Sequence, residues 1–232
     1  MNQEALTNPR RHWTITREAL AFTASVLLFP LGWRKSRKKT ARAADQRTVV
    51  FIHGYLANRS SFLPLAGYLA AKGYRSQLSF EYRPGDSIEQ AAIKLKHFLK
   101  NHVRGGRIDF ICHSLGGLVA RVYLQQLGGA RRVDRCITIA TPHHGTYNAY
   151  WLWTRVAQDL RPSSELLKRL ADTRANAASV KFLAIGGGAD RIVLPPHHAE
   201  FAESNLHFPD IGHQGLLFSP SVFRQIQQHL AG

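Results

Sequence analysis

The sequence predicts an α/β fold in which helices cover both faces of a mostly parallel sheet of about six strands, with a small helical cap. Short apolar runs alternate with amphipathic segments throughout residues 47–232, and neither a repeat nor a low-complexity segment interrupts them. The chain has 232 residues, 44% of them hydrophobic, which is enough to bury one sizeable core. We therefore expect an apolar segment and a basic linker at 1–46, followed by one globular domain at 47–232.

Strands and helices alternate along most of this domain. Strands are expected at residues 47–53, 74–82, 107–114, 133–140, 180–187 and 205–208. Helices are expected at residues 60–73, 86–102, 114–129 and 219–230. Gly73 ends the first of these helices, and Asp86 and Ser87 open the second. Since ligands of parallel sheets bind beyond the carboxyl ends of the strands, the functional site is expected at that edge.

Ser114 stands where one expected element changes into the next. The stretch FICHSLGGLVARVYL at 110–124 begins as a buried strand and continues as a helix, and Gly116 and Gly117 permit a tight turn between them. Such a turn would lift the Ser114 hydroxyl above the sheet edge, beside the helix N-terminus. A serine before a helix is often only an N-cap, but that role does not explain the paired glycines.

An acid and a histidine follow two later strands. Asp190 comes just after the fifth expected strand, and His213 just after the sixth. A serine hydroxyl needs a neighbouring base to become a good nucleophile, and that base needs a group to orient it. We therefore expect Ser114, His213 and Asp190 to form a catalytic triad, in the chain order of a nucleophile-elbow enzyme. Asp210 and Glu200 are the alternative acids.

The tetrahedral intermediate of such a reaction needs hydrogen-bond donors for its oxyanion. The backbone N–H of Leu115, directly after the serine, is one candidate donor. The loop after the first expected strand, HGYLANRSSF, offers a second donor at Tyr55. An ordinary turn at the strand end is the alternative interpretation of His53 and Gly54.

Several motifs together give the chain a family resemblance. They are FIHGY at 51–55, CHSLGG at 112–117, ATPHHGT at 140–146, and the spaced Asp190 and His213. From about Arg47 to Leu230 the sequence resembles α/β-hydrolases, and among them bacterial lipases and related acyl hydrolases. The resemblance implies hydrolysis of carboxylic esters, in particular lipid esters, through an acyl-enzyme on Ser114. One departure is Cys112, because the family pattern places glycine two residues before the nucleophile. Cys112 lies within the expected strand and is a poor alternative nucleophile.

A segment of roughly 35 residues separates the fourth and fifth expected strands, and long insertions of this kind are often functional. In the proteins that the chain resembles, this region forms a lid or cap, which we expect at about 147–179. Its first residues include four aromatic side chains that could line an acyl-chain site or dip into a lipid surface: Tyr147, Tyr150, Trp151 and Trp153. The alternative is that they form the buried face of cap helices.

The N-terminal segment has features of a membrane contact. Residues 19–33 are uncharged, and a basic run follows, with Arg34, Lys35, Arg37, Lys38, Lys39 and Arg42. As a helix the uncharged stretch covers about 22 Å, less than the roughly 30 Å of a hydrocarbon core. A signal peptide would explain its apolar length, and ARA at 41–43 resembles a cleavage site, but dense positive charge after an apolar segment resists translocation.

We therefore expect membrane association on the cytoplasmic face of the inner membrane. The alternatives are an exported protein, or a soluble cytoplasmic protein whose N-terminal helix packs on the domain surface. The formal net charge of +16 favours an anionic membrane surface as partner of the N-terminal segment. Nucleic acid is not expected as a partner, because the basic run RKSRKKTAR contains no aromatic side chain.

Neither a metal nor another cofactor is expected. The pairs His143/His144 and His197/His198 lack the spacing of a zinc-binding helix, and both cysteines lie in apolar runs rather than in a ligand cluster. The sequence thus favours a carboxylic ester hydrolase. An acyltransferase or thioesterase on the same triad, or an inactive, basic membrane-binding protein, remain the alternatives.

Overall fold

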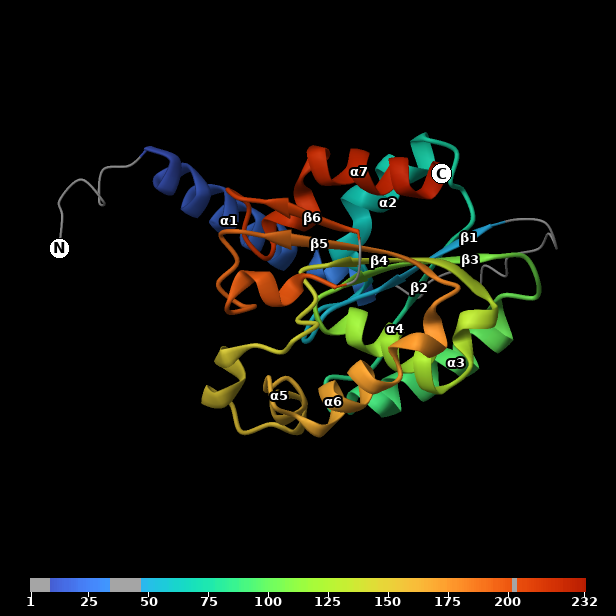
Figure 1. Cartoon of the computed structure of the whole chain (residues 1–232). Helices are drawn as coiled ribbons and strands as arrows, with labels where there is room; N and C mark the ends of the chain where they lie inside the picture. The colour runs from blue at the N-terminus through green and yellow to red at the C-terminus, as the bar shows by residue number, and fades with distance from the viewer. Residues whose placement is uncertain (1–8, 34–46, 202–203) are drawn as a thin grey trace.

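The described part of the chain contains a sheet of six strands, all of them parallel. The computed structural model describes residues 9–33, 47–201 and 204–232. The strands are β1 (Thr48–Ile52), β2 (Gln77–Phe80), β3 (Ile108–His113), β4 (Val133–Ile139), β5 (Lys181–Gly187) and β6 (Asn205–Phe208). They pair in the order β2-β1-β3-β4-β5-β6 (Figure 1). The predicted parallel sheet is confirmed.

Helices cover both faces of this sheet, as predicted. On one face, α3 (Ile88–His102) and α4 (Leu115–Gln126) share a core with the side chains of alternate strand residues such as Ile52 and Phe110. On the other face, α2 (Leu63–Ala71) and α7 (Pro220–Ala231) pack on the intervening residues, such as Phe51 and Ile111 (Figure 1). The period-two alternation of strand side chains thus builds two cores, one on each side of the sheet.

The helices and strands begin and end close to their predicted residues, with two differences. The predicted helix at 60–73 begins as a 3₁₀ turn, η3 (Arg59–Phe62), and continues as α2 from Leu63. The predicted strand at 74–82 is shorter, because β2 is an edge strand and pairs only with Val49–Ile52 of β1. Ser87 and Gln90 form a capping box that fixes the start of α3.

Short helices connect β4 to β5 in the segment predicted to be the cap. They are η5 (Tyr147–Trp151), α5 (Arg155–Asp159), α6 (Glu165–Asp172) and η6 (Arg174–Ala177). Leu166, Leu167 and Leu170 of α6 join the core beside α3 and α4. The segment is therefore anchored to the domain by α6 and presents η5 and α5 beyond the carboxyl edge of the sheet (Figure 1).

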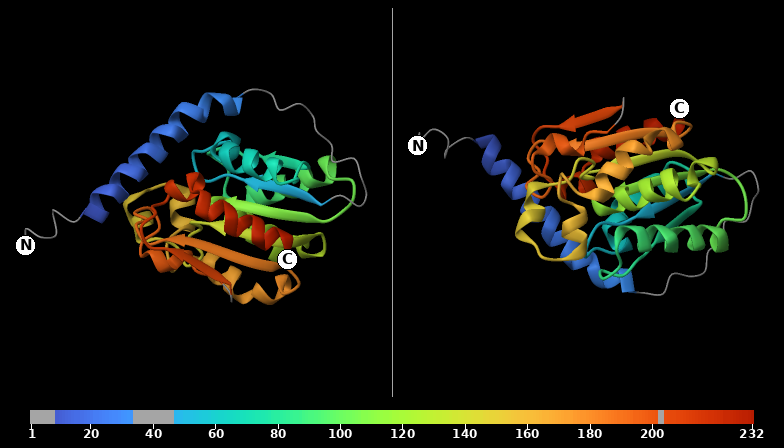
Figure 2. Two further views of the ribbon diagram at one scale, coloured as in Figure 1. Left: turned by 90° about the horizontal axis from the view of Figure 1, so that it is seen from above. Right: turned by 60° about the horizontal axis from the view of Figure 1, so that its bottom comes forward.

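The N-terminal helix α1 (Pro9–Leu28), followed by the 3₁₀ turn η2 (Phe29–Trp33), runs along that same edge in both views of Figure 2. The helical stretch Trp13–Gly32 is long and apolar enough to cross a membrane by length and composition, a property it shares with signal sequences. Only 11% of it is buried. The basic run and the ARA sequence fall within residues 34–46, outside the described residues.

The strand order places a topological switch point between β1 and β3. The chain passes from β1 outward to β2 and then returns across β1 to β3, so the loops after β1 and β3 diverge from neighbouring strand ends. The pairing of Ile52 with Cys112 brings the residues after each strand side by side. Ligands of open parallel sheets bind in the crevice at such a point, and Ser114 lies there.

Candidate active site

Ser114 lies on a strained turn between β3 and α4. Its backbone has φ 50° and ψ −123°, in the left-handed half of the Ramachandran map that side chains other than glycine avoid. Its N–H donates to the Ile139 carbonyl of β4 at 2.8 Å. Helix α4 closely approaches the end of β1, since a Cβ at Gly116 would lie 2.3 Å from the Ile52 carbonyl oxygen. The N-cap alternative fails, because the Ser114 side chain makes no capping hydrogen bond.

The structure brings Asp190 and His213 together. Nδ1 of His213 lies 2.7 Å from Oδ2 of Asp190, and both side chains are buried. A carboxylate only accepts, so Nδ1 carries the hydrogen and Nε2 is left as the basic nitrogen. The other carboxylate oxygen, Oδ1, accepts from the N–H groups of Ile192 and Val193 at 2.7 and 2.9 Å. These bonds hold the carboxylate in an orientation that fixes the imidazole.

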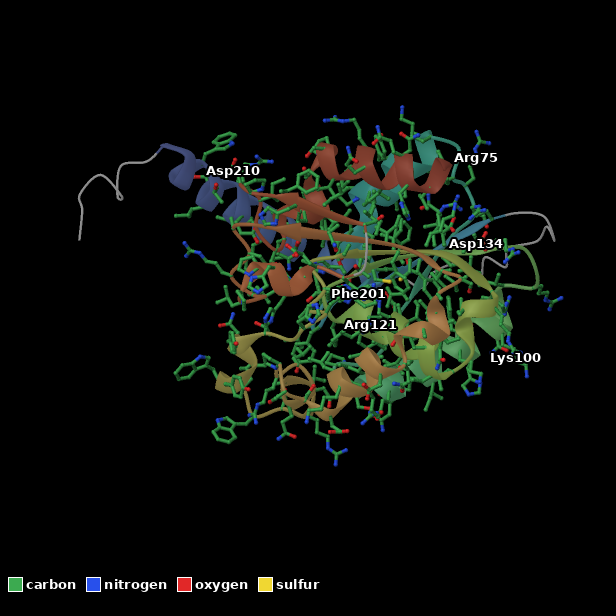
Figure 3. All side chains as sticks on the ribbon, in the orientation of Figure 1. Arg75, Lys100, Arg121, Asp134, Phe201 and Asp210 are labelled. Atoms are coloured by element: carbon green, nitrogen blue, oxygen red, sulfur yellow. The ribbon has the colours of Figure 1, made fainter. Side chains whose placement is uncertain are left out.

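Of the three predicted acids, Asp190 is the one that bonds the His213 ring. Within the described residues, neither Asp210 nor Glu200 makes a hydrogen bond or ion pair with that ring. Asp210 lies after β6, at the end of the molecule where α1 begins (Figure 3). Glu200 follows the 3₁₀ turn η7 (Pro196–Ala199) and is exposed.

His213 is positioned against the residue that precedes the serine. Nε2 of His113 donates to the His213 carbonyl at 3.4 Å, and the two ring centroids are 4.8 Å apart. Burial lowers the pKa of His113 well below its ordinary value, and the nearby His213 adds to the effect, so His113 stays neutral. The predicted nucleophile and base therefore belong to loops that touch one another.

One predicted oxyanion donor, Leu115, directly follows Ser114, and the loop that carries the other, Tyr55, packs against the serine. Gly54 packs against the serine, since a Cβ there would lie 3.1 Å from the Ser114 Cβ, and Tyr55 is the next residue. Across the described residues, no backbone carbonyl accepts from the N–H of Leu115 or of Tyr55. Both donors are thus available to a negatively charged oxygen.

Sequence reasoning missed Tyr82, which supports the loop after β1. Its hydroxyl donates to the His53 carbonyl at 2.8 Å, and its ring stacks on the His53 imidazole with centroids 4.5 Å apart. Burial lowers the pKa of His53, so this ring also stays neutral. Tyr82 follows the short strand β2, and no local pattern in the sequence marks it for this role.

His143, in the TPHHGT loop, belongs to a structural cluster that sequence reasoning also missed. Its Nε2 lies 2.9 Å from Thr138 Oγ1, and Arg121 of α4 donates to its carbonyl at 3.2 Å. Arg121 also donates to the Leu170 carbonyl at 3.0 Å and lies 4.2 Å from the Phe201 ring centroid (Figure 3). Burial lowers the pKa of Arg121 to about 9, so the guanidinium is still charged at neutral pH. The cluster thus holds the TPHHGT loop, which follows β4, against α4 and the cap segment.

Two further expectations from the sequence concern a metal site and Cys112 as an alternative nucleophile. Among the described residues, no three His, Cys, Asp or Glu side chains gather as metal ligands. Cys112 is fully buried in β3, beneath the turn, and its pKa is raised well above the ordinary value by burial and by a hydrogen bond with Cys136. A buried thiol with a raised pKa is a poor nucleophile, which agrees with its expected inert role.

The four aromatic residues of the cap segment are exposed rather than packed in the core. Tyr147 and Tyr150 are about half exposed, whereas Trp151 and Trp153 are 83% and 87% exposed. Tyr147 donates its N–H to the Leu194 carbonyl at 2.9 Å, so this segment adjoins the loop that follows Asp190. The alternative that these aromatics form the buried face of cap helices is therefore wrong.

Solved structures with the same fold include several lipases. Lipase BlEst2 of Bacillus licheniformis, in its mature form, superposes with a TM-score of 0.67 at 17% identity, over 84% of this chain and 96% of its own. Lipase B of Aspergillus fumigatus gives a TM-score of 0.70 at 17% identity, over 81% of this chain and 53% of its own. Phospholipase PlaB of Legionella pneumophila gives 0.54 at 16% identity, over 67% and 43%.

These likenesses show that the chain has the fold of the α/β-hydrolases, as its motifs predict. A family model matches residues 29–184, more than half of the chain. Its description is a domain of unknown function, DUF7379. The matched residues include Ser114, both predicted oxyanion donors and the TPHHGT loop. The protein is therefore a member of the DUF7379 family.

Proposed function

We propose that the protein is a serine hydrolase that cleaves carboxylic esters through an acyl-enzyme. The observation that carries the proposal is the 2.7 Å hydrogen bond between His213 Nδ1 and Asp190, in a loop that touches the strained turn of Ser114. This bond fixes the tautomer in which Nε2 is free to act as a base. Structural neighbours named as lipases add support from the fold.

The reaction follows from the roles of these groups. Ser114 Oγ attacks the acyl carbon while His213 Nε2 takes the hydroxyl proton, and the N–H groups of Leu115 and Tyr55 stabilise the oxyanion. When the acyl C–O bond breaks, His213 returns the proton to the leaving alkoxide oxygen, which departs as an alcohol. Water, activated by the same imidazole, then hydrolyses the acyl-enzyme and restores the Ser114 hydroxyl.

A lipid ester at a membrane surface is the proposed substrate. Trp13, Leu20 and Leu27 form one exposed line along α1, at intervals of seven residues, and each is more than 60% exposed. The exposed Trp151 and Trp153 belong to the cap segment, which lies at the same end of the molecule as α1 (Figure 1). Large apolar side chains on a basic protein favour an anionic bilayer surface, where lipid esters are concentrated.

Hydrolysis of p-nitrophenyl esters tests the proposed reaction. The full chain should release p-nitrophenol from acetate, butyrate and octanoate esters, and Ser114→Ala should lower kcat/KM at least about 10³-fold while the circular-dichroism spectrum stays unchanged. Cys112→Ala is the matched control and should retain hydrolysis, because that side chain lies beneath the turn. Absence of hydrolysis by the folded wild type, or full activity of Ser114→Ala, would refute the proposal.

A further inference from the structure

Helix α1 is attached to the loop that carries His213. The Glu18 carboxylate of α1 accepts from the backbone N–H of Gln214 at 2.6 Å through Oε1, and from that of Gly215 at 2.9 Å through Oε2. The loop leaves space for this carboxylate, since a Cβ at Gly212 would lie 2.5 Å from Oε2. Both residues adjacent to His213 thus take part in docking α1, either by bonding Glu18 or by lacking a side chain.

A second contact fixes the other end of the N-terminal segment. The side-chain amide of Asn58 donates to the Phe29 carbonyl at 3.0 Å, and Gly32 packs against the same amide. Asn58 is the N-cap of η3, directly after the loop that contains Tyr55. The segment is therefore held both beside the predicted base and beside one predicted oxyanion donor.

A cavity of about 910 Å³ lies between α1 and the loops that follow β5 and β6. Helix α1 contributes Ile15, Ala19 and Phe22 to its wall, and the loop after Asp190 contributes Ile192, Leu194 and Pro196. Asp190 and His213 are also part of its lining. The volume falls within the range of about 300–1,000 Å³ that is usual for small-molecule sites. Its walls are mainly apolar. Its polar lining consists of Asp190 and His213 together with five residues outside the predicted triad: Thr14, Glu18, Arg191, Asp210 and Gln214.

The position of His213 decides which part of an ester this cavity suits. His213 lines the cavity, whereas Ser114 does not. The imidazole must return its proton to the oxygen of the leaving group, so the alcohol part of the ester has to lie on the histidine side of the serine. We propose that this cavity binds an apolar alcohol moiety of the substrate and that α1 forms its outer wall. The inference rests on the proposed serine hydrolase function and adds a specificity site to it.

Esters that differ only in the alcohol provide the test. Release of butyric acid from methyl butyrate and octyl butyrate, each below its solubility limit, is followed by pH-stat titration with the full chain. Ile15→Trp fills the cavity, and Phe22→Ala removes part of its wall. Each should lower the ratio of kcat/KM for octyl butyrate over methyl butyrate at least about tenfold. This factor corresponds to losing contact with about two buried methylenes. Thr23→Trp, on an exposed position of α1 outside the cavity, should leave the ratio unchanged.

Methyl octanoate, compared with methyl butyrate, separates this role from binding of the acyl chain. A ratio for octyl over methyl butyrate that stays at the wild-type value in both cavity variants overturns the inference. A change confined to the methyl octanoate preference also overturns it, because the cavity would then hold the acyl part. In either case hydrolysis that still depends on Ser114 leaves the proposed function intact, whereas a wild type inactive on every ester refutes both.

Discussion

The backbone of Ser114 is held in a conformation that an L-residue adopts at a cost of about 1–3 kcal/mol. Its φ of 50° is maintained by the N–H bond to Ile139 and by the close packing of α4 on the end of β1. In this conformation the hydroxyl makes no capping hydrogen bond with the first turn of the helix. The strained backbone at Ser114 thus lowers the stability of the fold and leaves the hydroxyl free to react.

Asp190 orients the predicted base, and its replacement tests that role. In Asp190→Asn the amide can donate to Nδ1, which favours the tautomer with hydrogen on Nε2 and removes the basic nitrogen that faces the serine. We expect kcat to fall by about 10³- to 10⁴-fold, with little change in KM, in p-nitrophenyl butyrate hydrolysis. Glu200→Gln, at the exposed alternative acid, should retain wild-type kcat. Equal losses in the two variants would exclude Asp190 as the orienting acid.

The sequence predicts those features of the site that depend on residues close together in the chain. A strand, a serine and paired glycines within a few positions predicted the turn at Ser114. There is a physical reason why the sequence does not predict the supporting residues. Tyr82 and Arg121 act through backbone carbonyls of distant segments, at His53 and Leu170. A carbonyl acceptor exists at every position, so the sequence around it gives no sign of its partner.

The contact between α4 and β1 is the element-scale feature on which the site depends. Gly116 lies where the helix crosses the end of the strand, and a Cβ there would lie 2.3 Å from the Ile52 carbonyl oxygen and 2.6 Å from that of His53. Backbone atoms cannot move aside as a flexible side chain can. Because Gly116 has no Cβ, the N-terminus of α4, Ser114 and the loop after β1 that contains Tyr55 can pack together in one arrangement.

Gly116→Ala should therefore separate α4 from β1. We expect the free energy of unfolding, measured by urea denaturation, to fall by about 2–3 kcal/mol, with loss of esterase activity in the remaining folded protein. Gly67→Ala is the matched control: Gly67 lies in α2, and apart from its chain neighbours and the backbone of its own helix no atom lies within 4 Å of the added Cβ. Because alanine favours a helix, this variant should be as stable as the wild type or up to about 1 kcal/mol more stable. A Gly116→Ala protein of wild-type stability would contradict the packing argument.

The sequence predicts helix α1 as an apolar segment but does not predict which loop it contacts. The apolar run at 19–33 predicted a membrane contact or a surface helix, yet Glu18 lies just before that run and its partners are 196 and 197 residues away. A carboxylate on an amphipathic helix has the same sequence appearance whether it faces water or two backbone N–H groups. Hydrophobic periodicity predicts that a face is buried but not which distant loop buries it.

At the scale of the whole molecule, the carboxyl edge of the sheet collects the features that matter for a lipid substrate. Helix α1 and the cap segment lie at this end, as does Asp210, whereas Arg75, Lys100 and Asp134 lie at the opposite end (Figure 3). A molecule bound to a bilayer by α1 and the cap would place the candidate site close to the lipid surface. The net charge of +16 would strengthen binding to anionic lipids.

Sedimentation with phospholipid vesicles tests this orientation. The full chain should bind vesicles that contain phosphatidylglycerol more tightly than vesicles of phosphatidylcholine alone, and added salt should weaken the difference. Replacing Trp13, Leu20 and Leu27 together by serine should weaken binding at least about tenfold, because three large apolar side chains no longer enter the bilayer. Binding that is unchanged by these replacements and insensitive to lipid charge would contradict the proposed membrane surface.

The central claim is that Ser114 is an activated nucleophile. Labelling with a fluorophosphonate, followed by tryptic digestion and mass spectrometry, tests it most directly, because the peptide at 108–121, IDFICHSLGGLVAR, contains one serine and no threonine or tyrosine. We predict a phosphonyl adduct on Ser114 in the wild type, with the Cys112 thiol unmodified, and no adduct in His213→Ala, which lacks the base. A folded wild type that remains unlabelled, or that carries the adduct on another residue, would contradict the account.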